Sequence, residues 1–247
     1  MADADALKDR VRDAVEEHRE AVVSLARDIR DEPELGYRET ATERKVAAAF
    51  ESMGLDVETG RAVTGVRARA GSGSPVVAVL GELDALVNPE HPRADPETGA
   101  CHACGHEAQI ANLVGTAFAL TATGVLDHLE GAVEFVAVPA EEYLDLEYRK
   151  GLLEAGEIEF FGGKQELIRR GYLEDVDAAM MVHAADDTPE REVTTAFSTN
   201  GFVGKFVTYE GKESHAGAAP EEGVNALNAA TMGINGVHAL RETFADE

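Results

Sequence analysis

Three short apolar runs constrain the fold of this chain more than any other sequence feature. They cover residues 75–84, 133–139 and 178–182, and stretches with apolar residues at helical spacing separate them. Runs of this kind are typical of strands that are buried on both faces of a parallel sheet. The alternation of strand and helix therefore predicts an α/β fold with a doubly wound, mostly parallel sheet.

The remaining elements are predicted from apolar periodicity and from turn-forming residues. Residues 57–69 have the composition of a strand, and residues 71–75 have that of a tight, hairpin-like loop. Residues 143–163 are strongly charged and have no clear period, so we expect a loop or an irregular helix there. Helices are predicted at about 4–29, 39–53, 105–123, 164–171 and 225–244.

Metal-ligand side chains follow each of the three predicted buried strands. Asp84 ends the first strand, Glu141 and Glu142 follow the second, and His183 follows the third. In open α/β sheets, ligands bind outside the carboxyl ends of the strands. We therefore expect these four side chains to meet at one edge of the sheet.

Two thiols and two imidazoles lie within six positions, directly before the helix predicted at 105–123. They are Cys101, His102, Cys104 and His106. Thiolate and imidazole are ligands that suit a divalent transition metal. Because the start of that helix lies at the same edge as the strand ends, this stretch is expected to complete a metal site there.

Other interpretations of these residues remain open. Cys101 and Cys104 have the C-x-x-C spacing of a redox pair, and the two cysteines and two histidines could together hold a structural zinc. A redox pair leaves the acids that follow the predicted strands unexplained, and ligands spaced this tightly in one loop rarely complete a tetrahedron around zinc. Taken alone, Glu141 and Glu142 could form a solvated acidic turn, and His183 could be an ordinary core histidine.

The charge of the chain excludes some classes of partner. There are 47 acidic and 22 basic residues, giving a net charge of −25 that is spread along the whole sequence. Few lysines and distributed carboxylates are typical of a halophile surface, with an acidic mesophilic protein as the alternative. Because a phosphate backbone needs a basic face, nucleic acid is not expected as a partner.

Membrane insertion and secretion are not expected either. No stretch of about 18 apolar residues predicts a membrane span. The acidic N-terminus does not have the layout of a signal peptide, and two cysteines do not make a disulfide framework. A cytoplasmic location is therefore predicted.

The character of the chain changes near residues 187–198, where we expect a domain boundary. Beyond it, residues 203–209 alternate as a strand, and residues 211–220 form a small-residue loop that contains His215. The predicted division is into residues 1–190 and residues 191–247. His215 could be an ordinary loop residue.

The motifs of the chain resemble those of the metallopeptidase family of aminoacylases, dipeptidases and glutamate carboxypeptidases. Within that family they are most similar to the amidohydrolase branch, and their sequences resemble those of aminobenzoyl-glutamate hydrolases in particular. The resemblance extends over about residues 35–240. It rests on G-E-L-D-A-L at 81–86, H-A-C-G-H at 102–106, P-A-E-E at 139–142, G-G-K at 162–164, V-D-A-A-M-M-V-H at 176–183 and G-K-E-S-H-A-G-A-A-P at 211–220.

The resemblance implies a set of metal ligands. By position, Cys104 would bridge two divalent metals, with His106 and His183 at one metal and Glu142 at the other. Asp84 would not bind a metal itself but would orient one of the residues that do. The implied metal is zinc or manganese, with cobalt or nickel also compatible, and up to two ions.

The resemblance also implies an activity. Glu141 would act as general base in the hydrolysis of an amide by a metal-activated water. The substrate would be an N-acyl amino acid, an aminobenzoyl-glutamate-like conjugate or a small dipeptide. His215 would reach the active site of a partner subunit and polarise the scissile carbonyl.

The resemblance implies a domain organisation as well. Residues 1–190 would form a zinc-exopeptidase-like catalytic domain, and residues 191–247 a partial α+β lid domain that mediates homodimerisation. Family members are longer and take a further metal ligand from a histidine near their C-terminus, so we expect this chain to be truncated. The charged segment 143–161 looks like an insertion. The alternative is a non-catalytic metal-binding fragment or subunit that lacks the last ligand.

Overall fold

The computed structural model describes residues 3–185, 193–195, 201, 204–205 and 207–244. The chain divides into two compact units, Met1–Asp187 and Thr188–Glu247. No helix in the described ranges is long and apolar enough to cross a membrane.

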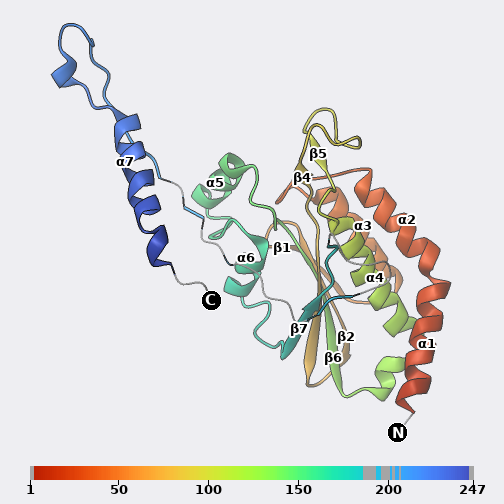
Figure 1. Cartoon of the computed structure of the whole chain (residues 1–247). Coiled ribbons are helices and arrows are strands. Elements are labelled where there is room, and N and C mark those ends of the chain that lie inside the picture. The colour runs from red at the N-terminus through yellow and green to blue at the C-terminus, as the bar shows by residue number, and fades with distance from the viewer. Residues whose placement is uncertain (1–2, 186–192, 196–200, 202–203, 206, 245–247) are drawn as a thin grey trace. The chain divides into compact units, whose positions relative to one another are not determined.

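The first unit is built on a five-stranded sheet (Figure 1). β2 pairs antiparallel with β1 and with β6, whereas β3 pairs parallel with β6 and with β7. All strands except β2 therefore run in one direction, which confirms the predicted mostly parallel sheet. In spatial order, the strands are β1 (Val57–Arg61), β2 (Gly65–Ser72), β6 (Gly131–Val138), β3 (Val76–Glu82) and β7 (Ala178–Met181).

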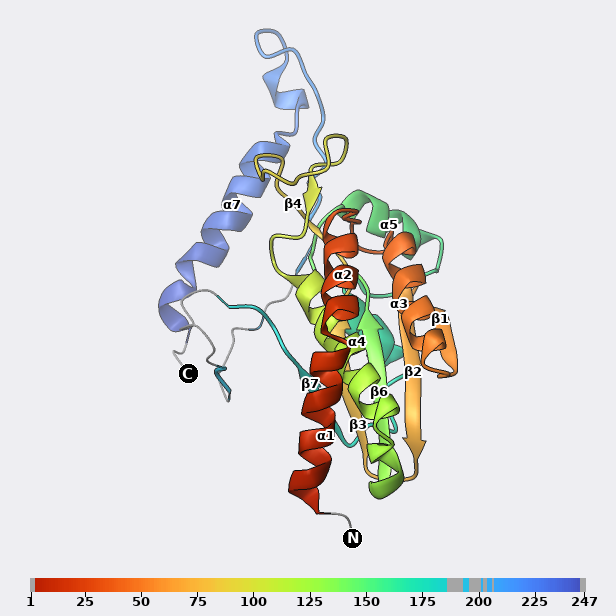
Figure 2. The same cartoon turned by 90° about the vertical axis from the view of Figure 1, so that its right-hand side faces the viewer.

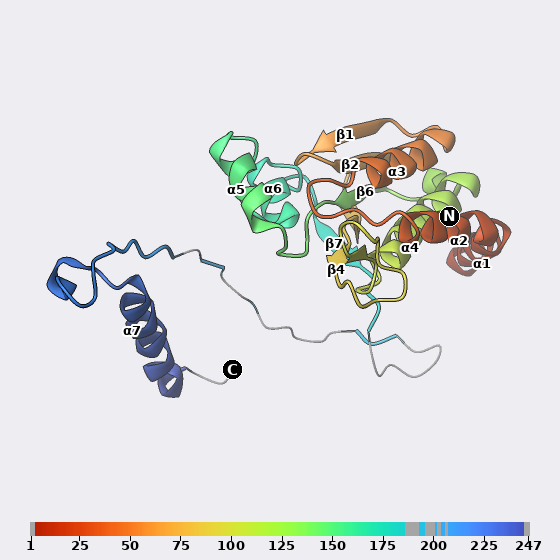
Figure 3. The same cartoon turned by 90° about the horizontal axis from the view of Figure 1, so that it is seen from above.

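Helices cover both faces of this sheet, as the view from above shows (Figure 3). One face carries four helices, with α1 and α2 following each other alongside α4 (Figure 2). The other face carries two shorter helices. The first group is α1 (Ala4–Glu17), α2 (Arg19–Arg30), α3 (Thr40–Ser52) and α4 (His106–Ala122), and the second is α5 (Leu146–Glu154) and α6 (Gly163–Arg169).

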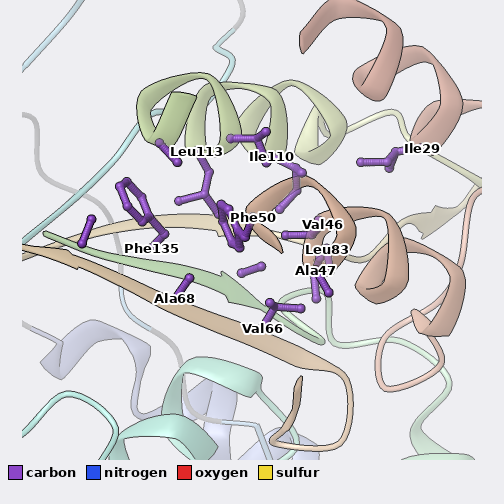
Figure 4. Packing of buried hydrophobic residues seen from close by; sticks show 14 residues of the cluster. Ile29, Val46, Ala47, Phe50, Val66, Ala68, Leu83, Ile110, Leu113 and Phe135 are labelled. Carbon is purple, nitrogen blue, oxygen red and sulfur yellow. The ribbon is translucent and has the colours of Figure 1, made fainter. Parts of the chain in front are cut away.

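The main hydrophobic core lies between the sheet and the first group of helices (Figure 4). Phe135 of β6 packs there with Phe50 of α3 and Leu113 of α4. The next residue along β6, Val136, points to the opposite face and packs with Leu167 of α6. β6 is thus buried on both faces, as its apolar run predicted.

Two predicted elements are divided in the structure. The helix predicted at 4–29 is interrupted at His18, whose ring stacks on Phe118 of α4 with 4.8 Å between the ring centroids. The strand predicted at 57–69 is two antiparallel strands, because Ala62 and Val63 have positive φ values of 47° and 77° and reverse the chain. Apolar spacing alone does not reveal either break.

Two predictions about strand surroundings are wrong. Residues 71–75 do not close a hairpin, because β2 and β3 each pair with β6 and not with each other. The strand at 178–182 is not buried, because β7 lies at the edge of the sheet, and Met180 is 57% exposed. In both cases the local residue pattern predicts the type of element correctly but does not predict which strands lie next to it.

Among the residues described in the second unit, the long helix is α7 (Ala226–Ala239), which a 3₁₀ turn at Arg241–Thr243 follows. Lys212 and Val224 form an isolated antiparallel bridge at the base of the preceding loop. The strand predicted at 203–209 is not found among the residues described there, and Val203 and Phe206 lie outside them. Most of the predicted boundary at 187–198 also lies outside the described residues.

Candidate metal centre

A tight turn brings the cysteine–histidine stretch to the carboxyl edge of the sheet. The stretch leaves β5 (Ala100–Cys101), which pairs with β4 (Leu86–Val87), and enters α4 at its first residue. Gly105 makes the turn with a φ of 95°, a conformation that glycine adopts without strain. A Cβ at Gly105 would also lie 3.0 Å from the Cβ of Ala184, so glycine permits the close approach of the segment that follows β7.

Side chains from two separate segments of the chain meet beside this turn. The Sγ atom of Cys104 lies 3.5 Å from Nε2 of His183. The rings of His106 and His183 meet edge to face, with 5.9 Å between their centroids. One ligand atom from each of these three residues lies within 4.8 Å of the other two. The structure therefore brings together three of the four residues predicted as ligands.

Glu142, the fourth predicted ligand, lies near enough to the thiol of Cys104 to affect its pKa. Burial of the thiol, together with the charge of Glu142 and a hydrogen bond to it, raises the pKa of Cys104 to about 12. The Glu142 oxygens are not among the atoms that lie within 4.8 Å of one another. Glu142 thus borders the group of Cys104, His106 and His183 without belonging to it.

Asp84 connects the acidic pair to His106. Its Oδ1 accepts the backbone N–H of Glu141 at 3.1 Å, and its Oδ2 accepts that of Glu142 at 3.0 Å. The Nδ1 atom of His106 lies 2.7 Å from the Asp84 carbonyl oxygen, which can only accept, so Nδ1 carries the proton. Nε2 of His106 is then the nitrogen that remains for a metal.

Sequence reasoning missed Glu82, the last residue of β3. Its side chain is buried, and its Oε2 lies 3.1 Å from Nε2 of His106 and accepts a 2.7 Å hydrogen bond from Gln109. A signal was available in the sequence. Residues i and i+2 of a strand share a face, so an acid two positions before Asp84 points toward the same site.

Among the described residues, the cation that pairs with these acids is Lys164. Its Nζ atom pairs with Oε1 of Glu82 and lies 3.8 Å from Oε1 of Glu141. Glu82, His106 and Glu141 also form a second group whose ligand atoms lie within 4.8 Å of one another. The motif residue Lys164 therefore adjoins the residue predicted as general base.

The charges of the site shift the pKa values of its groups. Burial lowers the pKa of His106, but its hydrogen bonds to Asp84 and the charge of Glu82 outweigh burial and raise it to about 9. Burial and the charge of Glu82 raise the pKa of Glu141, which the charge of Lys164 opposes. These shifts reflect a concentration of carboxylates that favours a bound cation.

The side chains present fit a divalent transition metal. They offer sulfur, imidazole nitrogen and carboxylate oxygen, the donor set that zinc and related metals prefer. Nε2 of His106 is buried, and its polar neighbour among the described residues is Oε2 of Glu82 at 3.1 Å. A metal beside Cys104 and His183 would therefore find an imidazole nitrogen and a buried carboxylate next to each other.

Cys101 and His102 lie outside both groups of ligand atoms. The Sγ atom of Cys101 faces the carbonyl oxygen of Asn88 at 4.0 Å, and burial raises its pKa. Burial, helped by the charge of His106, lowers the pKa of His102 to about 4. Both cysteines are free thiols, and their different surroundings do not support a redox pair or a four-ligand structural zinc.

His215 lies in the second unit, within the loop closed by the bridge between Lys212 and Val224. Its Nδ1 atom accepts the backbone N–H of Gly217 at 3.2 Å, and the residue is exposed. Its participation in catalysis stays a prediction.

Known proteins with similar sequences cover most of this chain. The IAA-amino acid hydrolase ILR1-like 4 of Arabidopsis thaliana is 32% identical over 91% of this chain and 48% of its own length. A p-aminobenzoyl-glutamate hydrolase subunit of Escherichia coli is 31% identical over 95% of this chain and 46% of its own length. The chain thus spans about half the length of these curated relatives.

Solved structures show the same fold. A dinuclear metal binding peptidase of the M20 family from Bacillus subtilis aligns with a TM-score of 0.57 and 27% identity, over 70% of this chain and 45% of that chain. A putative aminohydrolase from Staphylococcus aureus aligns with a TM-score of 0.56 over 69% of this chain and 41% of that chain. At 24% identity, the second match shows the fold alone.

The sequence profile of one peptidase family matches residues 78–242, which include every residue of the candidate metal centre. The α/β fold and the gathered cysteine, histidine and acidic side chains agree with that match. On this evidence, the chain belongs to peptidase family M20/M25/M40.

Proposed function

We propose that this protein is a metal-dependent amidohydrolase. The observation that carries the proposal is the approach of ligand atoms from Cys104, His106 and His183 to within 4.8 Å of one another. No feature of the fold requires these three side chains to meet, whereas metal binding does.

The names of the relatives support a substrate class. An IAA-amino acid hydrolase, a p-aminobenzoyl-glutamate hydrolase subunit and an N-acetylcysteine deacetylase each imply an acyl group joined to an amino acid. We therefore propose that the substrate is an N-acyl amino acid, an aminobenzoyl-glutamate-like conjugate or a small dipeptide.

Cys104, His106, Glu142 and His183 would hold the metal, which we propose is zinc or manganese, with cobalt or nickel also suited and up to two ions bound. When bound, such a metal supplies a Lewis acid that polarises a carbonyl and acidifies water. The Asp84 carbonyl orients His106 by accepting a hydrogen bond from its Nδ1–H, so Nε2 is the nitrogen that would bind a metal.

Glu141 would act as the general base that takes a proton from water and returns it to the leaving amine. It is half-buried, its backbone is held by Asp84, and Lys164 lies 3.8 Å from its carboxylate. His215 would polarise the scissile carbonyl, because it occupies the place of the histidine in the matching motif of the family.

Further parts of the proposal concern assembly and setting. We propose a homodimer formed through residues 191–247, with His215 of each chain serving the site of the other. The excess of 47 acidic over 22 basic residues supports a halophilic source. The free thiols of Cys101 and Cys104 support a reducing, cytoplasmic location.

Metal analysis of three purified forms tests the metal centre. The unaltered chain, purified without chelator and loaded with zinc, should retain metal after gel filtration, and Cys104→Ser should retain at least about tenfold less. Cys101→Ser is the matched control and should retain as much as the unaltered chain. Equal metal in all three forms would remove Cys104 from the site.

A metal that binds without any hydrolysis of N-acyl amino acids would favour the alternative of a non-catalytic metal-binding subunit.

A further inference from the structure

The turn that carries Glu141 and Glu142 is held through its main chain. Asp84 accepts the N–H groups of both glutamates, and Oε1 of the buried Glu39 accepts the N–H of Ala140 at 2.7 Å. These contacts provide hydrogen-bond acceptors for the backbone N–H groups of the turn. Its carbonyl groups accept the backbone N–H of Gly163 at Ala140, 3.2 Å away, and that of Leu144 at Glu142, 2.8 Å away, and in addition they accept from the side chain of a residue in a different element.

That residue is Arg149 of α5, whose side chain is completely buried. Its Nη2 donates to the carbonyl oxygen of Glu142, and its Nη1 donates to the carbonyl oxygens of Phe161 at 2.6 Å and Ala140 at 3.4 Å. One guanidinium thus spans both ends of the acidic turn.

The surroundings of Arg149 are unusual for a buried charge. No carboxylate of the described residues forms an ion pair with it, and its partners are carbonyl oxygens and the rings of Tyr37, 5.4 Å away, and Tyr143, 6.0 Å away. Removing a guanidinium from water without a counter-ion is costly, so stability alone does not account for it. Orientation of the backbone that it contacts does account for it.

The turn itself needs external support. Ala140 has a φ of 51°, a left-handed conformation that is strained for a residue with a side chain. Arg149 packs so closely that a Cβ at Gly36 would lie 2.2 Å from its Nη2 atom and 2.8 Å from the Cα of Ala140. The conformation of the turn is therefore determined by what surrounds it.

We propose that Arg149 is a positioning residue, which sets the place of Glu141 and Glu142 by holding their main chain. It lies in the charged segment 143–161 that separates P-A-E-E from G-G-K, so this segment shapes the site through Arg149. The inference rests on the proposed function only in taking Glu142 as a metal ligand.

Hydrogen–deuterium exchange of the turn tests this directly. Arg149→Met should speed exchange of the amides of residues 140–142 by about tenfold, since hydrogen bonds from a charged group are lost. Lys150→Met, on the same helix at an exposed position, is the matched control and should leave exchange unchanged. Exchange in β6 should not change in either variant. Unaltered exchange of the turn in Arg149→Met would overturn the proposal.

A double-mutant cycle separates positioning from general destabilisation. Arg149→Met should weaken zinc affinity about tenfold in the unaltered chain and have no further effect in Glu142→Gln. An equal loss in both backgrounds would show a merely structural role. If the unaltered chain binds no zinc, the proposed function fails, and the exchange experiment still decides the role of Arg149.

If Arg149→Met does not fold, Arg149→Lys can be tested by hydrogen–deuterium exchange in its place. It keeps the charge but replaces the planar fork with one ammonium group, which cannot reach both ends of the turn. Exchange of residues 140–142 should then lie between that of the unaltered chain and complete loss of protection. Exchange identical to that of the unaltered chain would overturn the proposal.

Discussion

Glu141 is acted on by neighbours of opposite charge. Burial and the charge of Glu82 raise its pKa, and the Lys164 ammonium, 3.8 Å away, opposes that rise. A carboxylate whose affinity for protons is raised is a better proton acceptor, which suits a general base. The role proposed for Glu141 thus depends on Glu82 and Lys164 as much as on its own position.

At this scale we expect Glu141→Gln to retain metal and lose hydrolysis. The amide has nearly the same size as the carboxyl group but cannot accept a proton, so kcat should fall by at least about 100-fold. The measurement is kcat and metal content with an N-acetyl amino acid as substrate. Glu147→Gln, at an exposed position of α5, is the control and should behave as the unaltered chain. An unchanged kcat in Glu141→Gln would remove it as the base.

At the scale of elements, α6 is tied to the segment before it by one buried carboxylate. Glu166 of α6 accepts the backbone N–H groups of Glu159 at 3.0 Å and Phe160 at 3.2 Å. It also pairs with Arg169 and Arg170, each at 2.6 Å. Because α6 carries Lys164, this junction holds the cation that contacts Glu82 and Glu141.

This junction should make stability depend on pH. Burial raises the pKa of Glu166, but the hydrogen bonds from Arg169, Arg170 and the backbone outweigh it and lower the pKa from 4.5 to about 2. The ionised carboxylate therefore stabilises the folded chain above pH 4.5, and that contribution is lost as the pH falls from 4.5 toward 2. It amounts to at most about 3 kcal/mol.

Urea unfolding of the unaltered chain and Glu166→Gln at several pH values checks this expectation. The difference in the free energy of unfolding should be largest above pH 4.5 and shrink below it. Glu147→Gln should show no such change. A difference between the unaltered chain and Glu166→Gln that is constant with pH would contradict the assignment.

At the scale of the whole molecule, carboxylates outnumber basic groups and leave a net charge of −25. Ion pairs such as Arg12 with Asp9 and Lys8 with Asp5 lie on the surface, where each contributes little. Repulsion among the remaining carboxylates acts against the compact state at low ionic strength. Salt shortens the Debye length from about 10 Å at 0.1 M to about 3 Å at 1 M and so screens this repulsion.

We therefore expect KCl to stabilise the chain. Raising KCl from about 0.1 M to 1 M should raise Tm by at least about 4 °C, or roughly 1–2 kcal/mol for a chain of this size. Differential scanning calorimetry measures the shift, with sucrose at matched osmolality as a control for effects unrelated to charge. A Tm that falls or stays constant with KCl would contradict a halophilic surface.

The sequence by itself determined the succession of strands and helices, because apolar periodicity is a property of neighbouring residues. It also determined which residue types stand at strand ends, and hence that Asp84, Glu141 and His183 share one edge. The spacing of Glu82, two residues before Asp84, indicates the same face of the strand, but a single acid within an apolar run does not indicate that it contacts His106.

Only the tertiary structure decided which residues lie against one another. It placed β6 between β2 and β3, left β7 at the edge, and brought Lys164 to Glu82 and Arg149 to the acidic turn. These contacts join residues that are distant in the chain, and they depend on which surfaces can be buried together. No local pattern contains that information, since the cost of burying a charge is set by the partners it meets.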